Sequence, residues 1–362
     1  MEYRCGSYAW SGGSDGFGEW TLEGCAVDSG RIRFDRSDGS ATSPWVTPEF
    51  APSSAIASWN CRTPAQTGVE VRLQVRFADG TQSSWFSMGR WSSEPDVERG
   101  SVAGQRDSGI SIDTDTLVSE APFASLRVRA ITYGTIADGD PGATLRRVGV
   151  CWSDPKPGTW HAAPIAPDVT PTVIDGVPEC SQMVYPNGGN VWCSPVSLSM
   201  VIGYWNGNQA CAPLVEQTRT GVFDPVYGGY GNWAFNVAWA GSLGFVAQVA
   251  RFASLADARR WIDAGVPLIL SVSWDNGGSR RLTGAPVTSS KGHLTVLVGF
   301  DEAGRAIMNE PAAPDNASVR RTYAADELEA CWLTASGGSA YVVYPPGHPV
   351  PEGGGYAVST AS

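Results

Sequence analysis

The sequence predicts two domains, an all-β domain of the sandwich or jelly-roll class followed by an α+β domain. The length of 362 residues fits two domains at roughly 100–200 residues each. The first half alternates apolar and polar residues as strands do, and the second half places a helical pattern before several strands. From these patterns we expect a β-rich module over 1–153, a linker over 154–176, the α+β domain over 177–346 and a tail over 347–362.

The first half contains short amphipathic strands separated by turns. Residues 69–77 alternate without a break, with valine, leucine and phenylalanine on one face and charged or amide side chains on the other. The turn "ADGT" follows, and "SSWFSM" can return as the partner strand of a hairpin. Further strands are expected at 31–35, 54–60, 125–133 and 144–152. Several short strands of this kind favour a sandwich or jelly roll.

The second half begins after a stretch rich in Pro, Asp, Thr and Ala that has no sustained period and is typical of a linker. A helix is predicted over 194–205, where apolar residues repeat at helical spacing. A second helix, over 254–267, has Ser254 as its expected cap. Strands are expected at 268–274, 293–300, 306–311 and 339–346.

The charge and hydropathy of the chain exclude some partners. The formal net charge is −11 without a run of like charge, so nucleic acid, which requires a basic face, is not an expected partner. No stretch of about 18 apolar residues predicts a membrane span. The N-terminus lacks the basic start and apolar core of a signal peptide. The location stays open, because the protein is either cytoplasmic or secreted with its leader removed.

The chain has eight cysteines at long spacings and no C-x-x-C pair, so we expect no zinc site. If Cys193 is free, seven cysteines remain, and they cannot all be paired. The spacing therefore leaves the disulfides and the redox compartment undetermined.

Cys193 lies at the expected start of a helix, in the segment "NVWCSPVSLSMVIGYW". Pro195 suits a first helical turn, where its missing N–H costs nothing. A helix N-terminus together with a cationic neighbour lowers the pKa of a thiol enough to form a thiolate at neutral pH. Cys193 is therefore a candidate nucleophile, although a buried structural cysteine is the alternative.

His293 is the candidate partner for this thiolate. Of the three histidines, His161 lies in the linker and His348 in the proline-rich tail, whereas His293 opens a predicted strand after the loop "SSKG". A thiolate–imidazolium pair needs a histidine held on rigid backbone. The alternative is a histidine at a strand edge that has no catalytic task.

Two further groups could complete such a site. Asn309 and Glu310 follow His293 by about 16 residues across a turn, so either could orient the imidazole from a neighbouring strand, but alternation puts them on opposite faces. The alternative is a strand-ending turn before Pro311. Gln182 could supply an oxyanion donor together with the N–H of Cys193, or it could be a surface glutamine.

Four blocks in order, "VPECSQM", "WCSPVSLSMVIGYW", "GHLTVLVGF" and "AIMNEPA", resemble the papain-like cysteine peptidases related to bacteriocin-processing double-glycine peptidases. The likeness covers about 177–345 and is strongest to stand-alone bacterial relatives without a transporter. It implies a papain-like α+β fold, with Cys193 as nucleophile, His293 as general base and Gln182 as oxyanion donor, and it implies no metal or cofactor.

Two features depart from the family pattern. Glu310 stands where the family usually has the catalytic Asp, and its extra methylene moves the carboxylate outward by about one bond length, so Asn309 could serve instead. The loop "YPNGGN" between Gln182 and Cys193 also looks longer than usual.

The first half resembles the β-rich module that precedes the peptidase domain in some actinobacterial relatives. Such a module could bind carbohydrate or a protein surface. Its tryptophans could form a binding platform or could belong to the core; the candidates are Trp45, Trp59, Trp85 and Trp91.

The predicted function is cysteine-dependent hydrolysis of peptide bonds in a peptide or protein substrate. One alternative is another thiol amidase or transferase, although cell-wall enzymes of that kind usually carry a second histidine soon after the first. The other alternative is a catalytically inactive peptide- or glycan-binding protein. The substrate, the cleavage specificity and the oligomeric state cannot be predicted from the sequence.

Overall fold

The structure is a computed structural model, and its described part contains five α-helices and is otherwise mostly β-sheet. The described residues are 3–12, 16–64, 66–94, 96–136, 142–154, 170–186 and 189–351. Most of the predicted linker, with His161, and most of the predicted tail lie outside these residues. No helix in the described ranges combines the length and the apolar content that crossing a membrane requires.

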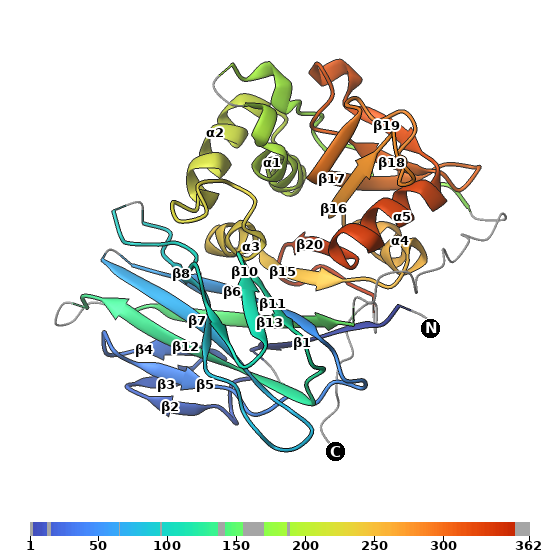
Figure 1. The fold of residues 1–362 in the computed structure, drawn as a ribbon. Coiled ribbons are helices and arrows are strands. Elements are labelled where there is room, and N and C mark those ends of the chain that lie inside the picture. The colour runs from blue at the N-terminus through green and yellow to red at the C-terminus, as the bar shows by residue number, and fades with distance from the viewer. Residues whose placement is uncertain are drawn as a thin grey trace. The chain divides into compact units, whose positions relative to one another are not determined.

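The chain forms two compact units, and neither is a continuous stretch of sequence. One unit contains Gly6–Asp154 together with Phe223–Val249, and we call it the sandwich unit. The other contains described residues within Pro155–Val222 and Ala250–Ala357, and we call it the helical unit. Figure 1 shows their elements, with the sandwich strands in blue to green and the later strands in orange to red.

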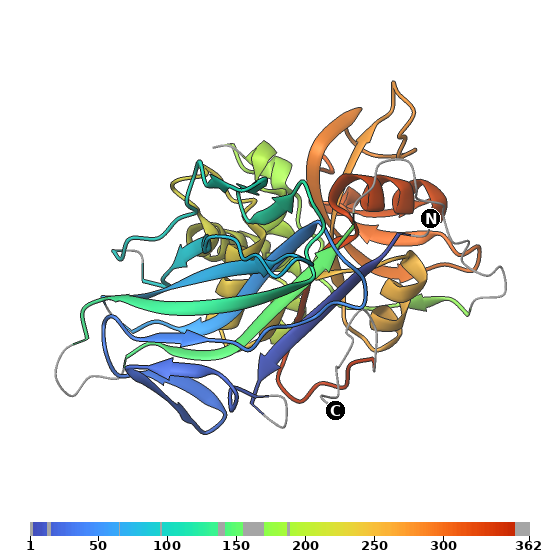
Figure 2. The same ribbon diagram turned by 60° about the horizontal axis from the view of Figure 1, so that its bottom comes forward.

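The sandwich unit is built from two antiparallel sheets that share one core. The larger sheet has the order β3-β4-β13-β6-β11-β10-β9, and β1 pairs with β13. Its strands are β1 (Cys5–Ser11), β3 (Cys25–Asp28), β4 (Arg31–Phe34), β6 (Ser54–Arg62), β9 (Arg106–Asp107), β10 (Ile110–Asp113), β11 (Thr116–Ser119) and β13 (Thr144–Ser153). Figure 2 shows these strands from a second direction.

The smaller sheet has the order β2-β5-β12-β7-β8. Its strands are β2 (Thr21–Glu23), β5 (Ser40–Thr42), β7 (Thr67–Arg76), β8 (Phe86–Trp91) and β12 (Ser125–Gly134). In the pairing of β12 with β7, Val128 lies opposite Leu73 and both side chains are fully buried. The residues on either side of them point to the other face, because side chains alternate along a strand.

The predicted hairpin after residue 77 is confirmed. The apolar face of β7 faces the core, since Val69, Val71, Leu73 and Val75 are all fully buried. The turn is closed by two backbone hydrogen bonds: the N–H of Phe77 donates to the carbonyl of Thr81, and the N–H of Gly80 donates to the carbonyl of Phe77. The alternation of apolar and polar residues in the sequence therefore predicted both the strand and its buried face correctly.

One helix from the second half of the sequence belongs to the sandwich unit. In α3 (Trp233–Ser242), Phe235 packs edge-on against the rings of Trp59 and Trp91. Gly89 makes room for this ring, because a Cβ at that position would lie 2.7 Å from Phe235, and its φ of +142° also favours glycine. The amide of Asn60 bonds both backbone groups of Ala247, in β15 (Val246–Arg251).

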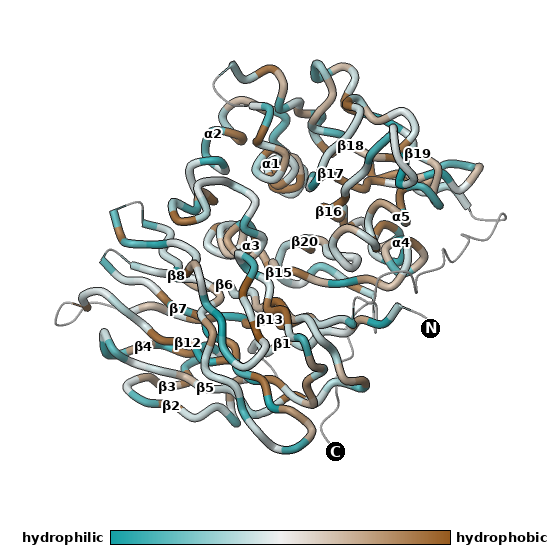
Figure 3. The backbone as a smooth tube through the Cα atoms, in the orientation of Figure 1, coloured by the Kyte–Doolittle hydropathy of each residue, from teal (hydrophilic) through white to brown (hydrophobic). Residues whose placement is uncertain are grey.

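In the helical unit, helices accompany an antiparallel sheet with the order β20-β16-β17-β18-β19, in which β14 also pairs with β17. The helices are η1 (Gln182–Val184), η2 (Gly189–Val191), α1 (Cys193–Asn206), α2 (Cys211–Val222), α4 (Leu255–Asp263), η3 (Asn316–Ser318) and α5 (Ala325–Ser336). The strands are β14 (Thr172–Val173), β16 (Leu268–Asp275), β17 (Ser289–Phe300), β18 (Ala306–Asn309), β19 (Arg320–Tyr323) and β20 (Ser339–Tyr344). Apolar stretches along β13 and β16 are brown in Figure 3.

The predicted helix at 194–205 is confirmed as α1, but it is not amphipathic. All of its residues from Ser194 to Gly203 are buried, and the serines among them bond other parts of the unit. The helix ends at Gly207, which adopts a left-handed conformation with φ of +63°. Helix α1 therefore lies in the interior of the unit, which fixes the position of its first residue.

Candidate active site

Cys193 is the first residue of α1 and carries a free, half-buried thiol. The N–H groups of the first helical turn have no partner within the helix, so this end carries partial positive charge. Ser197, one turn later, donates a hydrogen bond of 3.0 Å to the carbonyl of Leu294, the residue after His293. This bond ties the helix that bears the thiol to the strand that bears the imidazole.

His293 lies in β17 and is 4% exposed. The imidazole interacts with Cys193, and this interaction lowers the pKa of the thiol. The edge of the Trp274 ring packs against the imidazole, with ring centroids 5.2 Å apart and an interplanar angle of 86°. The indole Nε1 of Trp274 donates to the carbonyl of Val287, which holds the ring in place. The imidazole is therefore fixed by packing as well as by hydrogen bonds.

Glu310 lies on the other side of the imidazole. Its Oε1 is 2.5 Å from Nε2 of His293, and its side chain is fully buried. Oε1 also accepts the N–H of Ala312 at 2.8 Å, and Oε2 accepts the hydroxyl of Tyr323 at 3.5 Å. Because Nε2 faces Glu310, the nitrogen left for Cys193 is Nδ1. The extra methylene of glutamate does not keep this carboxylate from the ring.

Asn309 makes different contacts. Its Nδ2 donates to the carbonyls of Val177 at 3.3 Å and Pro178 at 2.9 Å. Adjacent residues on a strand point to opposite faces. Glu310 therefore contacts His293, whereas Asn309 holds the chain before Gln182.

The charges of these groups support one another. Burial raises the pKa of the Cys193 thiol, but the hydrogen bond and charge of His293 outweigh it, so this pKa lies below its usual value. Burial lowers the pKa of His293, but the Glu310 carboxylate and the Cys193 sulfur outweigh it, so this pKa is raised. Burial raises the pKa of Glu310, but the charge and hydrogen bond of His293 outweigh burial, so this pKa lies below its usual value. The arrangement therefore favours a thiolate, an imidazolium and a carboxylate.

Gln182 is 3% exposed and opens η1, which contacts η2 just before Cys193. Its backbone N–H donates to the carbonyl of Pro311 at 2.7 Å, next to Glu310. Its buried Oε1 has no hydrogen-bond partner within the described residues. A buried polar atom without a partner is uncommon in a protein interior.

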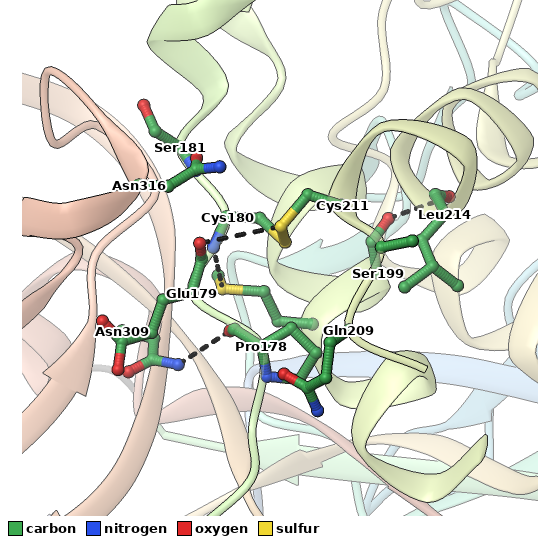
Figure 4. Close-up of a disulfide and its surroundings, with 12 residues drawn as sticks. Pro178, Glu179, Cys180, Ser181, Ser199, Gln209, Cys211, Leu214, Asn309 and Asn316 are labelled. Carbon is green, nitrogen blue, oxygen red and sulfur yellow. Dashed lines mark hydrogen bonds between the residues drawn. A yellow bond between two sulfur atoms is a disulfide. The ribbon is translucent and has the colours of Figure 1, made fainter. Parts of the chain in front are cut away.

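A disulfide fixes the chain just before Gln182. Cys180 and Cys211 are joined, so the segment is linked covalently to the start of α2 (Figure 4). The N–H of Cys180 also contacts the sulfur of Met200 in α1, and the N–H of Ser181 bonds Asn316 at 2.8 Å. The backbone beneath Gln182 is therefore held from several directions.

Gly189 allows the close approach of the chain after Gln182. A Cβ at this position would lie 2.0 Å from the carbonyl oxygen of Gln182, which no side chain can tolerate. The N–H of Gly189 donates to the carbonyl of Tyr185 and closes the loop. Part of the loop that looked long in the sequence, residues 187 and 188, lies outside the described residues.

The sequence proposed five site residues, and the structure brings three of them, Cys193, His293 and Glu310, into one row, in which His293 hydrogen-bonds Glu310 and interacts with the thiol of Cys193. Sequence reasoning did not find Ser197 or Trp274. Ser197 lies one helical turn after Cys193, on the interior helix, and this spacing is the only signal that could have indicated it. Trp274 ends an apolar strand and carries no such signal.

The structure also shows the surroundings of the four candidate tryptophans and of His348. Trp59 and Trp91 are fully buried in the sandwich core, whereas Trp45 and Trp85 are half-buried. His348 is not an exposed loop residue, because its ring packs on Trp205 and its Nε2 lies 2.8 Å from the carbonyl of Ala264.

Comparison with solved structures found distant likenesses. A protein from Bacillus anthracis described as a C39-like peptidase matches with a TM-score of 0.36 and 16% identity, over 49% of this chain and 98% of that one. Carbohydrate-binding modules of the β-sandwich superfamily match with a TM-score of 0.18 and 11% identity, over 42% of this chain and 56% of theirs. No curated protein matched the sequence.

Comparison with family models agrees with the resemblance seen in the sequence. Residues 18–153 match the model described as the Peptidase C39 N-terminal domain. Residues 174–340 match the model of the Peptidase_C39 like family. The chain is therefore similar to the Peptidase C39 N-terminal domain over its first part and to the Peptidase_C39 like family over its second part.

Proposed function

We propose that this protein is a cysteine peptidase in which Cys193, His293 and Glu310 form the catalytic row. The observation that carries the proposal is the hydrogen bond between His293 and the buried carboxylate of Glu310, together with the interaction of this imidazole with the thiol at the start of α1. A nucleophile, a base within hydrogen-bond reach and a third group that orients the base are the parts that covalent acyl transfer requires. We also propose that the helical unit has a papain-like α+β arrangement, supported by a thiol on a helix facing a histidine on a sheet.

In the proposed reaction, Cys193 starts as a thiolate and His293 as an imidazolium. The Cys193 thiolate attacks the carbonyl carbon of the scissile peptide bond, and the electron pair of the C=O bond moves to the oxygen. His293 then gives its Nδ1 proton to the leaving nitrogen as the C–N bond breaks. Water next attacks the thioester and loses a proton to His293, and the C–S bond breaks to release the acid and restore the thiolate.

The negative oxygen of the tetrahedral intermediate needs hydrogen-bond donors. The N–H of Cys193 belongs to the first turn of α1, and the side-chain amide of Gln182 is the second donor in this proposal. The rigid attachment of the Gln182 segment supports this role, because a donor fixed before the reaction needs no reorganisation in the transition state.

The position of Glu310 helps to choose between two functions, an active enzyme and an inactive binding protein with the same fold. A glutamate that had lost contact with the imidazole would favour the inactive alternative. The 2.5 Å contact between Glu310 and His293, together with the lowered pKa of Cys193, supports activity instead.

The test is to compare the full chain with its C193A variant on a mixture of peptides of random sequence, with the products identified by mass spectrometry. We expect cleavage by the wild type and none by C193A. The matched control is C25A, which removes another half-buried free thiol and should cleave normally. Equal cleavage by C193A and wild type would refute the proposal.

Iodoacetamide at pH 6 tests the thiolate separately from the choice of substrate. Cys193 should be alkylated much faster than free cysteine, because it remains ionised where an ordinary thiol is protonated. Alkylation no faster than that of free cysteine would support the inactive alternative.

A further inference from the structure

The outer face of the smaller sheet in the sandwich unit carries an alternating row of arginines and tryptophans. Arg76 and Arg127 lie over the ring of Trp45, with the guanidinium carbons 4.7 and 4.4 Å from its centroid. Arg127 and Arg129 lie over the ring of Trp85, at 5.1 and 5.4 Å. We call these five side chains the arginine face.

The three guanidinium groups are all held in the same way. Each donates its Nε to a neutral acceptor on the sheet: Arg76 to Ser125 at 3.0 Å, Arg127 to Gln74 at 2.9 Å and Arg129 to Thr42 at 2.9 Å. Within the described part of the chain, the Nη groups of these arginines make no hydrogen bond or ion pair. Each arginine is thus oriented by an inner hydrogen bond and an aromatic ring, and its terminal donors remain available.

Carboxylates accompany other arginines on the same sheet. Arg72 pairs with Glu70 at 2.8 Å, and Arg90 pairs with Glu98 at 2.8 Å. Arg127 instead has cations beside it, and its pKa is lowered first by burial and then by the charges of Arg129 and Arg76. Arg72 lies directly opposite Arg129, but Glu70 already neutralises it. The three neighbouring cations Arg76, Arg127 and Arg129 repel one another and form a site that favours an anion.

The tryptophans do not form an open platform. Each ring already has two guanidinium groups over it, so a sugar ring or a nucleobase that binds by stacking would compete with them. The terminal edge of a guanidinium matches a carboxylate by two parallel hydrogen bonds. The geometry of this face therefore favours carboxylates over stacking ligands.

The spacing of the arginines indicates which kind of carboxylate ligand fits this face. Arg127 and Arg129 are two residues apart on β12 and point to the same side, which places their Cα atoms about 6.6–6.8 Å apart. Acidic side chains on alternate residues of an extended peptide repeat at the same distance. We propose that the arginine face binds an acidic, extended polypeptide segment with carboxylates on alternate residues.

The test uses the full chain carrying C193A, so that the peptide is not cleaved and the outcome does not depend on the proposed activity. Isothermal titration calorimetry at low salt would measure binding of a peptide of twelve alternating glutamates and threonines. We expect measurable binding that weakens with added salt. R127Q/R129Q should raise Kd by about tenfold or more. R127K/R129K keeps the charge but loses the paired hydrogen bonds, so it should have an intermediate affinity.

A matched control removes the same charge from another cationic site of this unit. Arg31, Arg62 and Arg146 line a cavity of about 610 Å³ on the larger sheet. R31Q/R62Q should bind the acidic peptide like the parent protein. Equal weakening by R31Q/R62Q would overturn the proposal, because binding would then follow net charge or belong to the cavity.

Three ligands test the chemical class: the matched glutamine–threonine peptide, hyaluronate as a carboxylated polysaccharide, and polyuridylate as a nucleic acid. The proposal requires that none of them binds as tightly as the acidic peptide. Tighter binding of either polymer, or no binding of the acidic peptide at low salt, would contradict it. Thermal melting of R127Q/R129Q checks folding, and a variant that melts early is replaced by R129Q alone.

Discussion

Cys193 and Cys61 are both thiols without a disulfide partner, yet their surroundings give them opposite chemistry. Cys61 is fully buried in the sandwich core, where burial raises its pKa to about 12. Cys193 is also penalised by burial, but His293 more than offsets the penalty and its pKa falls. Burial alone therefore makes a cysteine inert, and an adjacent imidazolium makes it reactive. Cys331, with a pKa also raised to about 12, follows Cys61.

Removing the imidazole should abolish the difference between the two thiols. With H293A, Cys193 loses its cationic partner, and a thiol of ordinary pKa near 8.5 is only about 0.3% ionised at pH 6. We expect alkylation of Cys193 by iodoacetamide at pH 6 to fall by about 100-fold and peptide cleavage by about 1,000-fold or more. Mass spectrometry of the labelled peptides measures both cysteines, and the slow labelling of Cys61 should not change. Persistent fast labelling of Cys193 would mean that another group ionises it.

Neutralising Glu310 should reduce the difference in reactivity between Cys193 and Cys61 without abolishing it. The activity needs a thiolate, which is lost as pH falls through the pKa of Cys193, and an imidazolium, which is lost as pH rises through the raised pKa of His293. E310Q removes the charge that raises the pKa of His293, so the alkaline limit should move to lower pH. We expect kcat to fall by about 10- to 100-fold.

The pH dependence of kcat/KM measures this limit. E327Q is a matched control, since Glu327 is an acidic residue whose side chain bonds Thr283, outside the row. An unchanged alkaline limit in E310Q would show that Glu310 does not control the imidazole.

The paired cysteines offer a third environment. Cys180 and Cys211 close a loop with a sequence separation of 31, and a cross-link of that length is worth roughly 3.7 kcal/mol against the unfolded chain. C180S/C211S should lower the free energy of unfolding of the helical unit by about that amount. Urea unfolding measures the change, and C25S serves as the control. Equal stability of the variant and the wild type would mean that the bond constrains little.

The smallest effect is expected from the hydroxyl of Ser197. S197A leaves the carbonyl of Leu294 without this donor, which costs about 1 kcal/mol and loosens the crossing of α1 and β17. We expect kcat to fall by about fivefold at unchanged KM. S199A removes a buried hydroxyl of the same helix that bonds Pro195 and Leu214 instead, and it should keep kcat. Equal losses in both variants would indicate a general loss of stability.

The sequence indicated the position of Cys193 and His293 because local patterns define a helix start and a strand start. It could not choose between Asn309 and Glu310, because alternation says only that they face opposite ways. The choice shows only in the tertiary contacts, where Glu310 bonds His293 and Asn309 bonds the carbonyl of Pro178. The contact between Asn309 and Pro178 joins residues 131 positions apart and leaves no local periodicity.

Four strands of the helical unit, β16, β17, β18 and β20, and its first helix were also predictable, since their hydrophobic patterns are strong, whereas β14 and β19 were not predicted. The disulfide was not, because spacing alone does not select a pair among eight cysteines. The tryptophans show the same limit: Trp59 lies on a strand face that enters the core, whereas Trp45 and Trp85 lie over arginines on the outer face. Trp59 lies within β6, whereas Trp45 and Trp85 lie just outside strands, and only the tertiary structure shows which side each ring takes.

The packing of Phe235 into the sandwich unit has a practical consequence for anyone who divides the gene. A fragment that starts at residue 174 would retain α3 but lose the strands that cover Phe235, and it would present a bare aromatic surface to water. A fragment that stops at residue 153 would leave an empty niche above Gly89. Neither half is self-sufficient, so co-expression of two pieces cut at the linker should recover soluble material that neither piece yields by itself.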